Sequence, residues 1–396
     1  MTGRARYDET PARVYWELTR ACDLACQHCR AEAMASRAPD ELDTEECTRV
    51  LEQLASADPR PHVVFTGGDP LKRPDLITLL QRATALGVPA SVAPSATVGL
   101  TRETVQALKA AGVSAMSLSL DGPTPAQHDG VRGVPGCFGW TMAAAARIAE
   151  AGIPFQVNTL VTATSAPWLE EIATVVATMG AARWSLFFLI SVGRGRTLAP
   201  LDAEACEETL SWLASRASSW PFVVTTTEAP HYRRVVLERL RAAGAGREAI
   251  ASHPITRTFG LRDGNGIMFI AANGDVTPSG FLPMVAGNVR ATNPVEIYRD
   301  APLFRALRMP AAFGGRCGMC PFRNLCGGSR ARAWANGDVF GEDPLCVGFG
   351  DDASGALPGA LLAARAATGE RDARARVLTE PPGGGPSEAR QGPHHR

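Results

Sequence analysis

The sequence predicts an α/β protein built around a parallel sheet. Strand-like and helix-like segments alternate, with a repeat of about 30 residues, through the first half of the chain. The strand-like segments are apolar nearly throughout, which is typical of a sheet covered on both faces by helices. Several helix-like segments end in glycine, the usual residue at a helix C-terminus. These three observations together favour right-handed βαβ units.

Each element follows from its own residues. Gly87, Gly112 and Gly152 mark the ends of three expected helices. In chain order, strands are expected at 13–18, 62–66, 89–94, 114–120, 154–160 and 183–190, and helices between them at 43–56, 73–87, 101–112 and 137–152. This pattern suits an open doubly wound sheet as well as a closed or partial barrel. In both architectures, ligands bind at the C-terminal ends of the strands.

The regular alternation of strand-like and helix-like segments ends near residue 201. A helix-like run and a strand-like run lead to 266–280, where Asn273-Gly274 signals a hairpin turn, and one helix is expected at 294–308. We therefore divide the chain into a first domain, a connecting helical segment, a small α+β domain and a tail rich in Ala, Arg, Gly and Pro that is expected to be disordered. Their respective bounds are 1–200, 201–265, 266–350 and 351–396.

The composition of the chain limits the partners and the compartment that we expect. The 396 residues carry 40 Lys and Arg against 40 Asp and Glu, so the net charge gives no electrostatic reason to expect a nucleic acid partner. No run reaches the ~20 apolar residues of a membrane helix, and the N-terminus lacks the apolar core of a signal peptide. We therefore expect a cytoplasmic protein without a membrane partner. In that compartment cysteines favour metal ligation or free thiols over disulfides.

Seven of the ten cysteines fall into two groups. Cys22, Cys26 and Cys29 follow the first expected strand. Three thiolates suit a [4Fe–4S] cluster, because one iron then stays open to a substrate or cofactor. His28 is a further possible ligand, although its position beside Cys29 would strain such a site. The late group could form a zinc site, and it consists of Cys317, Cys320, Cys326 and Cys346.

Polar residues gather at the ends of other expected strands. The second strand ends in FTGGDP (65–70), where two glycines permit tight turns and leave the backbone bare. The fourth ends in SLSLDG (117–122), and the fifth carries Asn158. Because parallel strands end at one edge, these groups should surround the same ligand as the first three cysteines.

These residues resemble a known family. Cys22-x3-Cys26-x2-Cys29 after a first strand is similar to the signature of the radical S-adenosylmethionine (SAM) superfamily, and Gly67-Gly68-Asp69-Pro70 resembles its GGEP-type motif, with Asp in place of the commoner Glu. The resemblance covers about residues 15–190. It implies a partial (β/α)6, TIM-like barrel in which the three cysteines hold a [4Fe–4S] cluster. SAM bound to the open iron would be cleaved reductively to a 5′-deoxyadenosyl radical, which abstracts hydrogen from the substrate.

The resemblance also implies a SAM pocket. Gly67, Gly68 and Asp69 would meet the amino group of SAM, and Arg132 would pair with its carboxylate. His28 stands where an aromatic residue often lies beside the adenine, and the backbone of 188–190 would line the same pocket. The residues expected near the ribose or carboxylate are Ser95, Ser119, Asp121 and Asn158.

Residues 266–346 resemble the auxiliary-cluster domain called SPASM or, in shorter form, twitch. The four late cysteines are present, but Ser279 stands where related sequences often have Cys, and no cysteine occurs between 207 and 316. This departure implies one auxiliary [4Fe–4S] cluster, fully ligated by Cys317, Cys320, Cys326 and Cys346. A cluster without an open iron is suited to electron relay, so we expect two clusters in all.

The substrate class follows from the same likeness. The late segment resembles the branch of haem-pathway decarboxylases and haem d1 maturases, which implies a carboxylate-bearing tetrapyrrole substrate and a reductant protein such as flavodoxin or ferredoxin. Peptide maturases of the mycofactocin type are the alternative, and a non-catalytic iron–sulfur or zinc scaffold is the alternative of another class. Candidates for binding substrate carboxylates are the arginines at 194, 196, 233, 234, 257 and 262.

Overall fold

The computed structural model describes residues 7–348, apart from the side chain of Arg257, so the predicted tail at 351–396 lies outside the described residues. One sheet contains all eleven strands of these described residues, in the order β11-β10-β9-β1-β2-β3-β4-β5-β6-β7, with β8 paired to β9. The strands are β1 (Arg13–Glu17), β2 (His62–Thr66), β3 (Ala90–Val92), β4 (Ala115–Ser119), β5 (Phe155–Val161), β6 (Arg183–Phe188), β7 (Val223–Thr227), β8 (Arg262–Asp263), β9 (Gly266–Ile270), β10 (Asp275–Thr277) and β11 (Gly287–Asn288).

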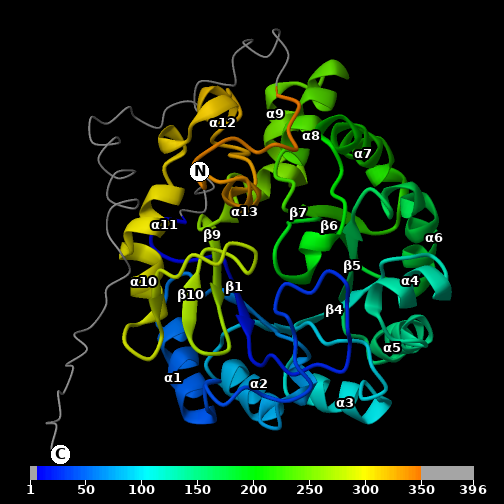
Figure 1. Cartoon of the computed structure of the whole chain (residues 1–396), viewed down its shortest axis with the longest axis vertical. Coiled ribbons are helices and arrows are strands. Elements are labelled where there is room, and N and C mark those ends of the chain that lie inside the picture. Colours follow the sequence, from blue (N-terminus) through cyan, green and yellow to red (C-terminus); the bar gives the residue numbers. More distant parts are fainter. Residues whose placement is uncertain (1–6, 349–396) are drawn as a thin grey trace, which may run out of the picture.

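The strand order distinguishes between the two architectures that the sequence allowed. Strands β1 to β7 lie side by side in chain order, and each neighbouring pair is parallel. A doubly wound sheet would reverse its order at a switch point. The sheet instead curls as a barrel with helices outside it (Figure 1), and no pairing recorded within residues 7–348 joins β7 to the β9 end. The fold is a partial (β/α) barrel, as predicted.

Helices connect the parallel strands. Helix α1 begins with a capping box in which the Asp43 side chain accepts from Glu46 N and the Glu46 side chain accepts from Asp43 N. The helices are α1 (Thr44–Ala55), α2 (Leu76–Ala85), α3 (Arg102–Ala110), α4 (Pro125–Arg132), α5 (Cys137–Glu150), α6 (Leu169–Met179), α7 (Ala203–Arg216), α8 (Tyr232–Ala242), α9 (Arg247–Ser252), α10 (Pro294–Asp300), α11 (Pro302–Leu307), α12 (Gly315–Met319) and α13 (Arg330–Ala335).

The expected helix at 294–308 is wrong as a single element. It is broken into α10 and α11 at Ala301, whose backbone is extended with φ −61° and ψ 134°. Proline at 302 causes the break, because its ring disfavours the helical conformation in the preceding residue. The predicted helix ends at Gly87, Gly112 and Gly152 are confirmed by their positive φ of 68°, 92° and 67°.

The two faces of the barrel strands differ in burial. In β1, Val14 and Trp16 are buried against the outer helices, whereas Arg13 and Tyr15 point to the other side and line a cavity. The same alternation runs through β2, β4 and β5. The expectation of strands covered on both faces is therefore wrong for the inner face, which surrounds a cavity instead of packed side chains.

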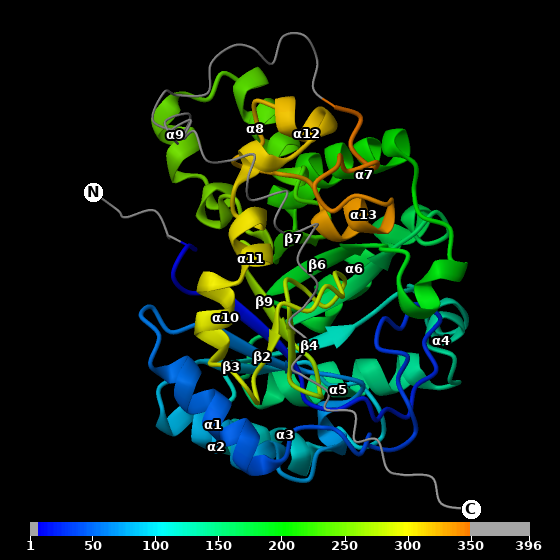
Figure 2. The ribbon, with the colours of Figure 1, turned by 60° about the vertical axis from the view of Figure 1, so that its left-hand side comes forward.

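The later part of the chain extends the same sheet. Strand β9 pairs in parallel with β1, so that Arg13 lies opposite Ile267, and β10 returns antiparallel to β9 around the predicted Asn273-Gly274 turn. Figure 2 shows α11, α12 and α13 gathered at one end of the barrel, near α8. The division into domains stays a prediction, and the sheet itself crosses the proposed boundaries at 200 and 266.

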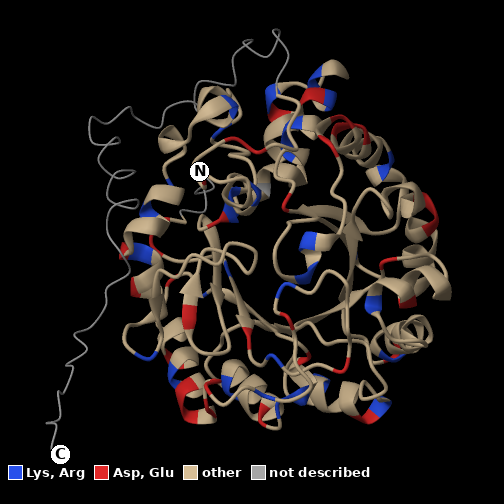
Figure 3. Ribbon diagram, in the orientation of Figure 1, with Lys and Arg blue, Asp and Glu red and all other residues tan. Residues whose placement is uncertain are grey.

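Charged residues of both signs are interspersed over the outer helices (Figure 3). None of the helices within residues 7–348 combines the length and the apolar character needed to cross a membrane.

The packing of β1 on β2 gives a test of the fold. Phe65 is fully buried, and its ring meets Trp16 edge-on with ring centroids 5.9 Å apart. We expect Phe65→Ala to lower the free energy of unfolding by about 3–5 kcal/mol, because it leaves a cavity in a close-packed core. Val98→Ala is the control, since Val98 is 67% exposed and should change the value by less than about 0.5 kcal/mol. Equal effects in urea unfolding would contradict the predicted packing.

Candidate active site

A cavity of about 360 Å³ occupies the barrel interior, from Arg13 at the start of β1 to the loops that follow the C-terminal ends of the strands. Cys22, Cys26 and Cys29 line it, and no disulfide joins them. The predicted residues that share this lining are Gly67, Gly68, Ser95, Ser119, Asp121, Arg132, Asn158, His28 and the segment 188–190. The structure therefore brings together nearly all the residues that the sequence placed at the site.

The three early thiols lie among hydrogen-bond donors. Cys22 Sγ accepts from Leu24 N at 3.4 Å, Cys29 Sγ accepts from Ala33 N at 3.5 Å, and Cys26 Sγ accepts from Arg132 Nη1 at 3.6 Å. Burial raises the pKa of Cys22, so the free thiol is protonated at neutral pH. Donors aimed at sulfur stabilise thiolates, and metal binding would displace the protons.

The Gly67-Gly68 turn is pressed against the start of the cysteine loop. A Cβ on Gly67 would lie 2.4 Å from Thr19 O, and one on Gly68 would lie 2.4 Å from Ala21 O. Backbone hydrogen bonds close the contact, because Gly68 N donates to Thr19 O at 2.8 Å and Asp69 N donates to Ala21 O at 2.7 Å. Glycine is thus required at both positions because the turn packs directly against the backbone of the cysteine loop, and it also leaves room for a ligand.

Asp69 does not join the lining of the large cavity. Its buried Oδ1 accepts from Leu71 N at 3.1 Å and from Ser95 N at 3.3 Å. Burial raises the pKa of Asp69 to about 6. In this arrangement Asp69 fixes Ser95, whose hydroxyl donates to Gly68 O at 2.9 Å and lies 3.4 Å from Cys22 Sγ.

Arg132 has a protein carboxylate as its partner. Its Nη2 lies 2.6 Å from Asp121 Oδ2, and both side chains are nearly buried, at 11% and 2% exposure. Asp121 Oδ1 accepts from Leu160 N at 2.8 Å. Although burial opposes ionisation, Arg132 and the two nearby histidines hold the pKa of Asp121 below its ordinary value. The pair is a buried ion pair beside Cys26.

His28 carries an unused polar atom. Its Nδ1 is buried and has no hydrogen-bond partner within the described structure. Burial lowers the pKa of His28 to about 4, so the ring is neutral at neutral pH. Ser119 and Asn158 are register neighbours on β4 and β5, and both face the same cavity. An orphaned nitrogen at a polar cavity wall fits a polar ligand there.

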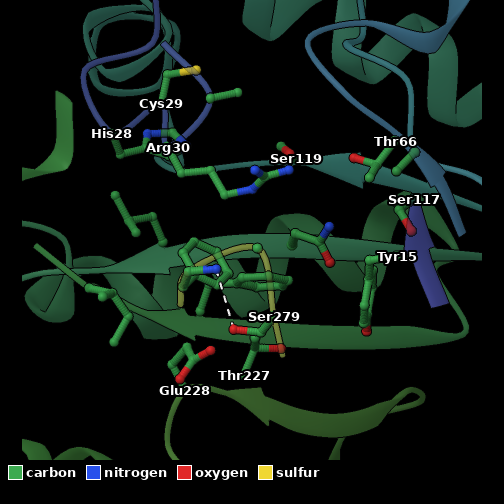
Figure 4. Close-up of a pocket in the computed structure, with 18 of the residues that line it drawn as sticks. Tyr15, His28, Cys29, Arg30, Thr66, Ser117, Ser119, Thr227, Glu228 and Ser279 are labelled. Carbon is green, nitrogen blue, oxygen red and sulfur yellow. Dashed lines mark hydrogen bonds between the residues drawn. The ribbon is translucent and has the colours of Figure 1, made fainter. Parts of the chain in front are cut away.

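Several arginines of the cavity were missed or only partly anticipated. Arg194 was a candidate, and its buried Nε and Nη2 lack partners in the described part of the chain. Arg13 was not among the residues predicted for the site. The signal for it was that successive side chains of a strand point to opposite faces, so that Arg13 points inward where Val14 points outward. Arg30 was missed too; it crosses the cavity (Figure 4), lying 3.2 Å from Glu17 and over the ring of Phe269 at 4.3 Å.

The other candidate arginines separate into two groups. Arg233 and Arg262 line the cavity, whereas Arg196 is exposed and Arg234 pairs with Glu207 and Glu238. The side chain of Arg257 lies outside the described residues.

The late cysteines line a second cavity of about 30 Å³. Each sulfur accepts one backbone N–H at 3.4 Å. The donors are Asp343 N for Cys317, Phe322 N for Cys320, Gly328 N for Cys326 and Gly348 N for Cys346. Arg330, which is fully buried, adds its Nη2 at 3.5 Å from Cys317 Sγ. Burial raises the pKa of Cys320 to about 11 and that of Cys326 to about 12.

The two cavities share a wall. Gly328 lines the late cavity, and the next residue, Ser329, lines the large one. Arg332 ties this wall to the end of β6, because its Nη2 lies 3.4 Å from both Phe188 O and Leu189 O. The adjacent residues Gly328 and Ser329 therefore border one cavity each.

Comparison with known proteins identifies the family of this chain. Residues 16–165 match the model of the radical SAM superfamily. The AdoMet-dependent heme synthase of Oleidesulfovibrio alaskensis is 38% identical over 349 residues, which cover 87% of this chain and 89% of that protein. The mycofactocin maturase MftC of Mycobacterium tuberculosis is 30% identical over 356 residues, covering 86% of this chain and 83% of the relative.

The fold agrees with a solved structure as well. The chain resembles Streptococcus suis SuiB bound to S-adenosylmethionine with a TM-score of 0.65 and 18% identity, over 86% of this chain and 78% of SuiB. The chain belongs to the radical SAM superfamily. It is an enzyme that uses S-adenosylmethionine and an iron–sulfur cluster.

The contact between the Gly67-Gly68 turn and the cysteine loop can be tested with a single methyl group. We expect Gly68→Ala to displace the loop, since the new Cβ would lie 2.4 Å from a carbonyl oxygen. Anaerobic iron analysis should show the loss of about four irons per chain, the content of one [4Fe–4S] cluster. Gly139→Ala on α5 is the control, because nothing lies within 4 Å of its Cβ. Full iron content in Gly68→Ala would contradict this reading of the turn.

Proposed function

We propose that the protein abstracts a hydrogen atom from a carboxylate-bearing tetrapyrrole, and that the late cysteines would hold an auxiliary cluster suited to electron relay. The observation that carries this proposal is the pair of thiol-lined cavities that share the wall at Gly328 and Ser329. When bound, a [4Fe–4S] cluster and SAM supply a 5′-deoxyadenosyl radical in the large cavity. The chain's own residues bind, orient and shield the reactants.

Cys22, Cys26 and Cys29 would hold the cluster that binds SAM. The N–H and guanidinium donors on their sulfurs support anionic ligands, and the orphaned His28 Nδ1 supports a polar group beside them. Gly67, Gly68, Ser95, Ser119 and Asn158 would line the SAM pocket. The ion pair of Asp121 with Arg132 would hold the wall of that pocket in place. Asp69 would position Ser95 without lining the pocket, because its Oδ1 accepts a hydrogen bond from Ser95 N.

The late cysteines would hold a fully ligated [4Fe–4S] cluster rather than zinc. In the part of the chain that the structure describes, no three His, Cys, Asp or Glu side chains are arranged to hold a single metal ion. A cluster binds each thiolate through a different iron, so its ligands need not converge on one point. One donated N–H on every sulfur supports four anionic ligands at this site. A cluster without an open iron is suited to relay electrons.

The cavity arginines support an anionic substrate. Arg13, Arg233 and Arg262 line one region of the cavity, and none of them forms an ion pair within the described residues. Burial, together with Arg330 and Arg233, lowers the pKa of Arg262 to about 9. Arg262 is still cationic at neutral pH, and an anionic ligand would relieve its repulsion. The likeness to an AdoMet-dependent heme synthase favours a tetrapyrrole as the source of the carboxylates.

A peptide is the second candidate substrate, and the likeness to MftC supports it at a lower identity of 30%. Both candidates need an electron to cleave SAM, and we propose a flavodoxin or ferredoxin in the cytoplasm as its source.

Substitution of each group of cysteines tests the proposed reaction. Anaerobically reconstituted wild type, supplied with dithionite and SAM, should form 5′-deoxyadenosine and hold about eight irons per chain. The Cys22/Cys26/Cys29→Ala variant should lose about four irons and form none of this product. The late-cysteine variant should also lose about four irons, yet keep 5′-deoxyadenosine formation while substrate turnover falls. Absence of 5′-deoxyadenosine in wild type with iron coproporphyrin III present would overturn the proposed reaction.

Arg194, a candidate for substrate carboxylates from the sequence, lies beside the early thiols in the structure and therefore provides a test of the SAM pocket instead. Its unpartnered N–H groups face the cavity near Cys29, whose carbonyl oxygen accepts from Arg194 N at 3.1 Å. We expect Arg194→Gln to weaken SAM binding roughly 10- to 100-fold, the value of one charge-assisted hydrogen bond of about 1.5–3 kcal/mol. Arg196→Gln, two positions away and exposed, is the matched control. Equal affinities in calorimetric titrations of the reconstituted variants would exclude this role.

A further inference from the structure

A carboxyl group that the proposed function does not use faces the substrate cavity. Glu228 follows β7 directly, and its φ of +59° lies in the left-handed region that side chains other than glycine seldom adopt. Such backbone conformations are concentrated at functional sites. Figure 4 shows Glu228 beside Thr227 and Ser279, across the cavity from His28 and Cys29. The strained turn thus directs an acid toward the cavity from the side opposite the early thiols.

Glu228 has a second carboxyl group beside it. Asp263, at the end of β8, also lines the cavity and hydrogen-bonds the Glu228 side chain. The Asp263 Oδ2 atom already accepts from Arg330 N at 3.1 Å and Ala331 N at 3.0 Å. Asp263 is thus held in place by two backbone N–H groups. Because two adjacent buried carboxyl groups resist ionising together, burial beside Asp263 favours the protonated form of Glu228.

The charged and polar groups that surround Glu228 determine whether its carboxyl group is protonated. Burial and Asp263 raise the pKa of Glu228 well above its ordinary value. The hydroxyl of Ser329, which donates to Glu228 Oε2 at 2.5 Å, and the guanidinium of Arg332 act in the opposite direction. Glu228 is therefore a neutral acid at a pH where an ordinary glutamate is ionised.

We propose that neutral Glu228 is a specificity-determining residue whose single O–H group turns from Asp263 to donate a hydrogen bond to a carboxylate of the bound substrate, and that ionisation of Glu228 repels the same carboxylate. This inference rests on the carboxylate-bearing substrate of the proposed function and deepens it. Arg233 and Arg262 line the same cavity, so a carboxylate there would meet cations and one neutral donor. With Glu228 ionised, it would meet a second carboxylate in place of that donor.

The sign of the pH dependence follows. Below the pKa of Glu228 the donor is present and binding is strongest. As pH rises through that pKa, affinity for an anionic ligand falls, by about tenfold per pH unit if only the neutral form binds. Asp263 raises this pKa, so Asp263→Asn should move the fall in affinity to lower pH. Ser329 lowers it, so Ser329→Ala should move the fall to higher pH.

The test uses iron coproporphyrin III as the probe, titrated by absorbance into the reconstituted full chain at several pH values. Wild type should show the fall in affinity, and Glu228→Gln, which keeps a donor without a titrating proton, should not. The two neighbouring variants should shift the fall in opposite directions, a result that a purely structural role of these residues would not give. Iron octaethylporphyrin, which carries no carboxylate, is the control ligand and should show no fall.

Three outcomes would overturn the inference. They are an unchanged pH dependence in Glu228→Gln, shifts of the same direction in Asp263→Asn and Ser329→Ala, and no binding of iron coproporphyrin III at any pH. Formation of 5′-deoxyadenosine by wild type is measured separately. It would continue to support the radical reaction in each of these cases, so failure of the inference is distinguishable from failure of that reaction.

Discussion

The site depends on one close backbone contact, where the ends of β1 and β2 meet. Gly67 and Gly68 lie against the carbonyl oxygens of Thr19 and Ala21, at distances that leave no room for a side chain. This contact holds the start of the cysteine loop on the rim of the barrel. Through Asp69 and Ser95 it also positions the polar groups beside Cys22. The GGD turn is consequently a structural support for the cysteines, and its two glycines also line the large cavity.

A second constraint comes from the later half of the chain. Because β9 pairs with β1 and Arg332 contacts the end of β6, the late segment is attached at both sides of the barrel opening. Gly328 lines the cavity of the late thiols, and Ser329 lines the large cavity. Ser329 also donates to Glu228, and Arg330 N donates to Asp263, so this segment contacts both the late cavity and the Glu228–Asp263 pair.

Most of the site residues could be predicted because their sequence signals are local and do not depend on tertiary contacts. The Cys-x3-Cys-x2-Cys spacing, the Gly-Gly turn and the polar strand ends each belong to a single segment, and parallel strands bring their C-terminal ends to one edge. The structure places them around one cavity. Asp69 is the exception, since the sequence could not show that its carboxyl group would turn away from the cavity and bind Ser95 N.

The sequence by itself determined the alternating elements, the helix ends at glycine and the two groups of cysteines, because these follow from short-range conformational preferences and residue chemistry. Only the tertiary structure decided that the sheet is a partial barrel with a cavity inside. It also decided that Arg132 pairs with Asp121, and that Glu228 shares a hydrogen bond with Asp263. These partners are distant in sequence, and burial sets their charge states. No local pattern encodes which groups will be desolvated together.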